Sequence, residues 1–166
     1  MGKRTFVLVG SVMLLTMSSG SKSVKYFEGI NPGDLAPRIE SLGNQRQISF
    51  QNHSGRYTLL NFWAAYNAES RAKNVQLTNK TSELGSDKIV LYSFSLDEKD
   101  SVFEETVKTD ELDATTQFHE ELGEKSVLYK KFHRKGGFNN FLINSEGVIV
   151  ASNVTPEKLT ELLQKN

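Results

Sequence analysis

Two polar side chains, Asn67 and Ser70, follow the apolar run Tyr57–Trp63 at a point where a helix could begin. A serine hydroxyl becomes a nucleophile only when a neighbouring base can remove its proton. No G-x-S-x-G turn surrounds Ser70, and the candidate bases are scattered through the sequence as His53, His119 and His133. The pattern therefore does not favour serine catalysis.

The chain of 166 residues contains no cysteine. Because the thiolate is the reactive and metal-binding form of cysteine, this absence removes disulfide bonds, thiolate metal ligands and thiol catalysis together. The segment His119-Glu120-Glu121 offers other metal ligands, but its spacing matches no H-E-x-x-H site, and a solvated acidic surface is the simpler interpretation. We predict no metal site and no cofactor.

The stretch around Asn67 is well suited to begin a helix. Asparagine is among the best N-cap residues because its side-chain oxygen accepts a free backbone N–H, and Glu69 adds a negative charge near the positive end of the helix dipole. One interpretation is therefore purely structural. The other is a shallow docking surface for a protein or peptide, with the candidate binding residues Trp63, Tyr66, Asn67, Glu69 and Phe138.

Two nearly continuous apolar runs, Tyr57–Trp63 and 89–96, have the composition of strands that are buried on both faces. Such strands usually pair in parallel, and we predict that segment 68–84 between them is a helix. The helix should bury a stripe of apolar residues at helical spacing, namely Ala68, Ala72 and Val75.

The remaining elements are shorter, and turn signals at Gly43-Asn44 and Ser145-Glu146-Gly147 predict two hairpins. We predict strands at 38–42, 47–50, 140–143 and 148–151, and helices at 101–108 and 125–132. The clearest helix follows a capping residue, Thr155, and begins with Pro156. Its apolar face contains Leu159, Leu162 and Leu163.

The first residues have the pattern of a secretory signal. The cationic stretch Met1–Arg4 precedes the apolar run Phe6–Met17, which is too short to span a bilayer comfortably, and small residues follow. We expect cleavage after Gly20 and export to the periplasm or cell envelope, with retention as an anchor as the alternative. The predicted divisions are a signal peptide at 1–20, an N-terminal lead at 21–32 and one domain at 33–166.

The charges of the chain are balanced, with 20 lysines and arginines against 20 aspartates and glutamates. A protein that binds nucleic acid or an anionic membrane usually has an excess of basic residues. We therefore expect neither partner, and no stable membrane insertion after signal cleavage. A bacterial lipoprotein signal needs a cysteine to carry the lipid, so covalent lipid anchoring is not expected either.

Four sequence blocks carry a family resemblance: GDLAP at 33–37, LLNFWA at 59–64, SFSLD at 93–97 and FLIN at 141–144. In order and spacing they resemble the thioredoxin-fold proteins of the bacterial envelope, the TlpA/ResA-like redoxins, and the most specific block is NFWA in front of a helix. The resemblance implies an α/β fold with a central mixed β-sheet flanked by helices, here with an N-terminal β-hairpin extension. It also implies a C-x-x-C pair at the helix start and a cis-proline loop that faces it.

In this sequence the family's two cysteines fall on Asn67 and Ser70, and its proline falls on Phe138. Disulfide exchange requires an attacking thiolate and a second thiol, which an amide and a hydroxyl do not supply. A cis peptide before a non-proline residue costs about 2.5–4 kcal/mol, so we expect a trans bond and a reshaped loop. A glutamate and a proline that the family often carries in the helix are replaced by Lys73 and Val75. The resemblance therefore implies a degenerate active site and a protein that is not an enzyme.

Two functional hypotheses follow. The first is an exported, redox-inactive thioredoxin-fold protein that binds a protein or peptide as an accessory module of the cell envelope. The second is a member of the thiol-disulfide oxidoreductase family that contributes to envelope redox homeostasis through an active partner.

Overall fold

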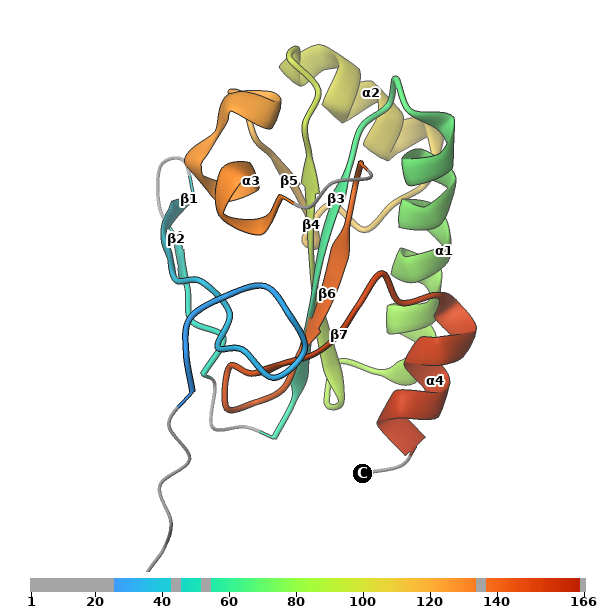
Figure 1. Cartoon of the computed structure of the whole chain (residues 1–166). Coiled ribbons are helices and arrows are strands. Elements are labelled where there is room, and N and C mark those ends of the chain that lie inside the picture. The colour runs from blue at the N-terminus through green and yellow to red at the C-terminus, as the bar shows by residue number, and fades with distance from the viewer. Residues whose placement is uncertain (1–25, 43–45, 52–54, 134–136, 165–166) are drawn as a thin grey trace, which may run out of the picture.

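The computed structural model describes residues 26–42, 46–51, 55–133 and 137–164, and its centre is a five-stranded sheet (Figure 1). The strands are β3 (Tyr57–Trp63), β4 (Ile89–Ser95), β5 (Gln117–His119), β6 (Asn140–Ile143) and β7 (Ile149–Ser152). They lie in the order β5-β4-β3-β6-β7, and β3 is parallel to β4 and antiparallel to β6. The mixed sheet predicted from the sequence is therefore confirmed.

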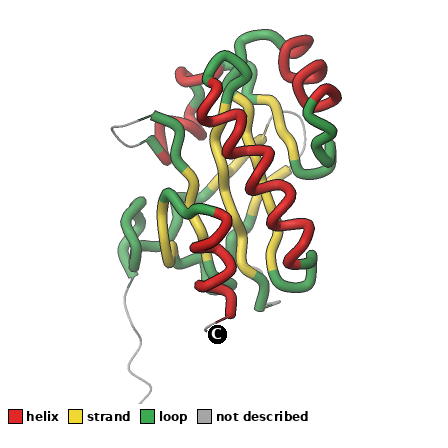
Figure 2. The backbone as a smooth tube through the Cα atoms, turned by 90° about the vertical axis from the view of Figure 1, so that its right-hand side faces the viewer, coloured by secondary structure: helices red, strands yellow, loops and turns green. Residues whose placement is uncertain are grey.

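Both faces of the sheet are covered (Figure 1, Figure 2). One face carries two neighbouring helices, α1 (Ala68–Leu84) and α4 (Pro156–Gln164). The other carries α3 (Val127–Phe132) and the antiparallel pair of β1 (Ile39–Leu42) and β2 (Arg46–Ile48), which is the expected N-terminal extension. The remaining helices are α2 (Asp100–Thr109) after β4 and the 3₁₀-helix η1 (Gly123–Lys125) after β5.

The continuous apolar sequence of β3 follows from this arrangement. Successive side chains of a strand point to opposite faces, so Leu59 packs in the core beneath α1 and α4 while Leu60 packs in the core beneath α3. Both residues are fully buried. A strand with a helix layer on each side must be apolar at almost every position.

The predicted buried stripe of α1 is wrong. Ala68 and Ala72 are exposed and Val75 is half-buried, whereas the helix buries a mostly polar set of residues: Ser70, Asn74, Leu77, Thr78 and Thr81. Hydrophobic periodicity does not detect such a face, because its polar side chains are buried by pairing with one another and with the sheet.

A chain of buried polar side chains joins α1 to the sheet. The Asn61 side-chain amide donates to Asn74 Oδ1 at 3.1 Å and to Ser93 Oγ at 2.9 Å. The Ser93 hydroxyl also donates to Asn74 Oδ1, and the Asn74 amide donates to Gln117 Oε1 at 3.0 Å. These four residues come from β3, α1, β4 and β5, and all are buried. The network is uncharged and fixes the position of α1 over three strands.

Asn74→Ala should destabilise the protein by about 1–3 kcal/mol, because it leaves buried donors and acceptors of Asn61, Ser93 and Gln117 without their shared partner. Urea unfolding followed by circular dichroism measures this difference. Asn79→Ala is the matched control, since Asn79 is exposed on the same helix and its loss should change stability by less than about 0.5 kcal/mol. Equal effects of the two substitutions would contradict the role given to the network.

Other predicted elements are present with small shifts in their bounds. The helix predicted at 101–108 is α2, the one predicted at 125–132 is shortened to α3, and the second hairpin consists of β6 and β7. The sequence analysis missed β5, a three-residue strand that pairs only with β4. The turn Gly43-Asn44 and the predicted signal peptide at 1–20 lie outside the described residues.

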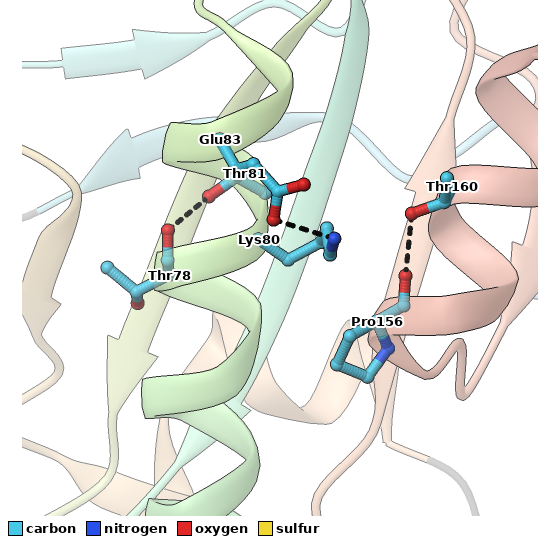
Figure 3. A network of polar contacts seen from close by, with 6 residues as sticks. All are labelled: Thr78, Lys80, Thr81, Glu83, Pro156 and Thr160. Atoms are coloured by element: carbon cyan, nitrogen blue, oxygen red, sulfur yellow. Dashed lines mark hydrogen bonds and ion pairs between the residues drawn. The ribbon is translucent and has the colours of Figure 1, made fainter.

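The last helix has the predicted cap, since Thr155 Oγ1 accepts the backbone N–H of Lys158 at 3.3 Å. Leu159 is buried and packs with Leu77 of α1. Figure 3 shows α1 and α4, in each of which a threonine hydroxyl donates to a backbone oxygen of its own helix. Thr81 donates to Thr78 O at 3.0 Å, and Thr160 donates to Pro156 O at 3.2 Å. Such bonds allow a hydroxyl to face another helix without an unpaired donor.

The segment before β1 lies against the edge of the sheet. Gly33 N–H donates to Ile149 O at 2.8 Å, and Ile149 N–H donates to Asp34 O at 2.9 Å. The predicted domain start at residue 33 stays a prediction, and residues before it also bond to this segment, since the Leu35 N–H donates to Phe27 O at 2.9 Å. Among the helices in the described ranges, none combines the length and apolar character that a membrane crossing requires.

Candidate functional site

The side chains at the start of α1 are engaged with its backbone. Asn67 is the N-cap, and its Oδ1 accepts the Ser70 N–H at 2.8 Å. The Ser70 hydroxyl is buried, donates to Asn67 O at 3.0 Å and accepts the Ala64 N–H at 3.1 Å. Both polar side chains that could do chemistry therefore tie the end of β3 to the first turn of the helix. In the part of the chain that the structure describes, the printed partners of the Ser70 hydroxyl are backbone groups and not a base that could remove its proton.

Asp97 supports the loop between β3 and α1 from the neighbouring strand. Its two carboxylate oxygens lie 3.1 and 2.9 Å from the Ala65 nitrogen, and Ser95 Oγ donates to it at 2.7 Å. The residue is only 3% exposed. Hydrogen bonds to a charged acceptor are stronger than neutral ones, so Asp97 holds this loop firmly.

His119, which the sequence analysis considered as a metal ligand, contacts other protein groups through both nitrogens of its ring. Its Nδ1 lies 3.0 Å from Asp100 Oδ1, and its Nε2 lies 2.7 Å from the backbone oxygen of Asp97. The ring also stacks on Phe103, with centroids 5.3 Å apart and planes inclined by 9°. Both ring nitrogens are therefore occupied. Within the described ranges, no three histidine, aspartate or glutamate side chains gather closely enough to hold a metal ion.

Trp63 does not belong to a surface, which corrects the expectation for this residue. It is 0% exposed and packs near Phe103, with ring centroids 6.4 Å apart. Alternation along β3 places Trp63 on the same face as Leu59 and Asn61, beneath the α1 layer. An interior side chain contributes no contact area to a docking partner.

Tyr66 and Phe138, in contrast, are brought together at the surface. Their ring centroids lie 6.1 Å apart, Tyr66 is 64% exposed, and Phe138 is partly buried against the core. Asn67 and Glu69 follow Tyr66 directly, and Glu69 is exposed. Every peptide bond of the described residues is trans, so the bond before Phe138 has the geometry expected for a non-proline residue. The structure thus brings Tyr66 and Phe138 together, and Asn67 and Glu69 are close to Tyr66 in the chain; whether these four residues bind anything stays a prediction.

The Tyr66 hydroxyl donates to Glu124 Oε1 at 3.3 Å. Partial burial, the negative charge of Glu124 and this hydrogen bond together raise the pKa of Tyr66 to about 12.

Arg71 forms a second link near the helix start, because its Nε and Nη2 contact the two oxygens of Asp110 at 2.7 and 2.6 Å. A paired Arg–carboxylate contact of this kind fixes α1 against the end of α2.

The sequence analysis did not identify Asp97, Glu124 or Asp110 as supports of this site. A signal for Asp97 was present, since it directly follows the apolar run of β4, and the ends of neighbouring parallel strands meet at the same edge of a sheet. Glu124 and Asp110 lie far from Tyr66 and Arg71 in sequence, and no local pattern points to these pairs.

No protein-family model and no curated protein sequence matches the chain. Among solved structures, a thioredoxin-like protein from Parabacteroides distasonis ATCC 8503 is 64% identical, with a TM-score of 0.77 and coverage of 84% of this chain and 99% of that chain. The chain belongs to the thioredoxin-like proteins. The predicted resemblance and fold are therefore confirmed.

Other thioredoxin-like structures are more distant. A thiol-disulfide oxidoreductase from Bacteroides fragilis NCTC 9343 is 26% identical, with a TM-score of 0.62 over 80% of this chain and 98% of that chain. A thiol:disulfide interchange protein from Bacteroides sp. is 22% identical and shares the fold, with a TM-score of 0.65 over 82% of this chain and 90% of that chain. Both of these neighbours are described as proteins of thiol-disulfide chemistry, whereas this chain has no cysteine.

Asn67→Ala should destabilise the protein by about 1 kcal/mol, because the Ser70 N–H loses its acceptor at the helix start. Asn67→Asp is the matched control and should retain most of the stability, since a carboxylate oxygen caps equally well. Urea unfolding of the three proteins provides the comparison. If the alanine variant were as stable as the wild type, the capping bond would not contribute to folding.

Tyr66 should remain a neutral phenol well above pH 10. Because its folded pKa is raised, the folded protein binds more protons than the unfolded chain between about pH 10 and 12. The stability from this phenol is present below pH 10 and is lost as the pH rises through 12. The tyrosinate absorbance of wild type minus Tyr66→Phe measures the transition, and Glu124→Gln should move it to lower pH. A transition near pH 10 in the wild type would refute the contact with Glu124.

Proposed function

We propose that this protein is an exported thioredoxin-fold module without redox activity, which binds a protein or peptide at its former active-site face. That face, the docking edge, consists of Tyr66, Asn67, Glu69 and Phe138. The observation that carries the proposal is the closed start of α1, where Asn67 and Ser70 bond to the backbone in place of a reactive pair.

Loss of redox activity follows from the chemistry of exchange. A thiolate must attack a disulfide, and a second thiol must resolve the mixed disulfide. The chain has no thiol at any position, and its helix-start carboxamide and hydroxyl cannot form a bond of this kind. One of the amides that could stabilise an anion at the helix terminus, that of Ser70, already donates to Asn67.

Binding at the docking edge is supported by an exposed aromatic ring, that of Tyr66, whose position is held by neighbouring side chains. Aromatic side chains dominate the energetics of many protein contacts. Tyr66 presents such a ring, and it is held from one side by Phe138 and from the other by Glu124. Because the loop beneath it is pinned by Asp97, little conformational freedom would be lost on binding.

Export is supported by the signal-like pattern of residues 1–20. A second candidate function is a contribution to thiol redox homeostasis of the envelope, in which this protein holds a substrate for an active partner. The retained fold favours this alternative. The docking edge occupies the place where, by the family resemblance, a thiol substrate would approach the helix start.

A cysteine pair placed at the helix start should restore redox chemistry. Asn67→Cys with Ser70→Cys puts two thiols at the N-cap and third helical position, where the helix dipole lowers a thiol pKa. Reduction of insulin with dithiothreitol should then exceed that of the wild type. The matched control, Asn79→Cys with Ser82→Cys, has the same spacing on exposed positions of α1 and should remain inactive. Equal activities of the two pairs would contradict the assignment of the site.

Photo-crosslinking in the native envelope tests binding. A photoreactive residue at Phe138 should capture a discrete partner, whereas one at Lys158, exposed on α4, should not. Absence of capture from Phe138, or the same products from both positions, would refute the docking edge.

A further inference from the structure

A groove of about 900 Å³ opens beside the docking edge. Its walls come from four places in the sequence: the loop after β3, the loop after β4, the first turn of α2, and the segment that contains η1. Tyr66 lies in this groove and also contacts Phe138, so the groove and the docking edge share one side chain. The volume is within the range of clefts that bind ligands in proteins.

Three exposed apolar side chains line the groove. Tyr66, Val102 and Leu122 line it with exposed fractions of 64%, 39% and 65%. In the part of the chain that the structure describes, these are three of the seven large apolar side chains that are exposed. Exposed apolar side chains that gather at one hollow usually mark a contact site.

Acidic groups outnumber basic ones around the groove. Four carboxylates line it against two lysine amines, and these residues are Asp97, Glu98, Glu121, Glu124, Lys99 and Lys125. All except Asp97 are exposed, so their charges can meet a bound chain. Glu124 also holds the Tyr66 hydroxyl, which keeps one carboxylate fixed at the wall.

We infer that this groove binds an extended segment of a partner protein in which an apolar residue is flanked by basic residues. The inference rests on the proposed function and deepens it by giving the chemistry of the partner. The apolar side chain enters between Tyr66, Val102 and Leu122, and the flanking cations meet the carboxylates. The groove adjoins the docking edge through Tyr66, so one extended segment can contact both.

Fluorescence anisotropy with labelled synthetic peptides tests the inference. The probe carries Lys-Leu-Lys, and two comparison peptides carry Glu-Leu-Glu and Lys-Gly-Lys in the same frame. The full protein should bind the first peptide more tightly than either comparison, and higher salt should weaken this binding. Glu121→Gln with Glu124→Gln should weaken it about three- to tenfold, since exposed charge pairs contribute modestly.

Two further variants keep the test specific. Glu83→Gln with Glu146→Gln changes the net charge equally at exposed positions outside the groove and should leave the affinity unchanged. Leu122→Ser truncates an exposed side chain and should weaken binding of the Lys-Leu-Lys peptide without unfolding the protein. Equal binding of the acidic peptide, equal effects of the two charge variants, or no binding of the basic peptide would overturn the inference. Capture from Phe138 does not depend on charge, so it decides separately whether the proposed function stands.

Discussion

The contact on which the site depends is the hydrogen bond from the Ser70 N–H to Asn67 Oδ1 at the first turn of α1. The first amides of a helix have no partner within the helix and must be satisfied from outside. Here the chain supplies that partner itself, and the Ser70 hydroxyl adds bonds to Asn67 and Ala64. A helix start closed in this way connects strand and helix, and both of its polar side chains are engaged with the backbone.

The start of α1 is held against the sheet by hydrogen bonds between uncharged side chains. Asn61, Asn74, Ser93 and Gln117 satisfy one another between α1 and the sheet. An unpaired charge in such a position would be expensive to bury, whereas satisfied amides and hydroxyls define one orientation of the helix. Charged side chains act at the loop instead: Asp97, which is itself buried, holds the loop before α1, and the exposed Glu124 orients Tyr66. The Tyr66 ring and the Glu124 carboxylate thus lie at the end of the sheet where α1 begins.

Much of this could be predicted from the sequence. The strands β3 and β4 and the bounds of α1 were recognisable because apolar runs and a local capping signal are sufficient for them.

The buried face of α1 could not be predicted, because Asn74 and Thr78 are buried through partners distant in sequence. Trp63 was misplaced because strand alternation was not applied to it. β5 was missed because three residues carry too little periodicity. The pairing of Tyr66 with Phe138 depends on tertiary structure, and only the family resemblance brought the two together.

Amide hydrogen exchange followed by NMR tests the closed helix start most directly. In the wild-type protein the Ser70 amide should exchange about fivefold more slowly than the Ala68 and Glu69 amides, which precede it in the first turn, and this difference should vanish in Asn67→Ala. Equal exchange of the three amides in the wild type would mean that the helix start is open, and the account of a structural cap at the former reactive position would be wrong.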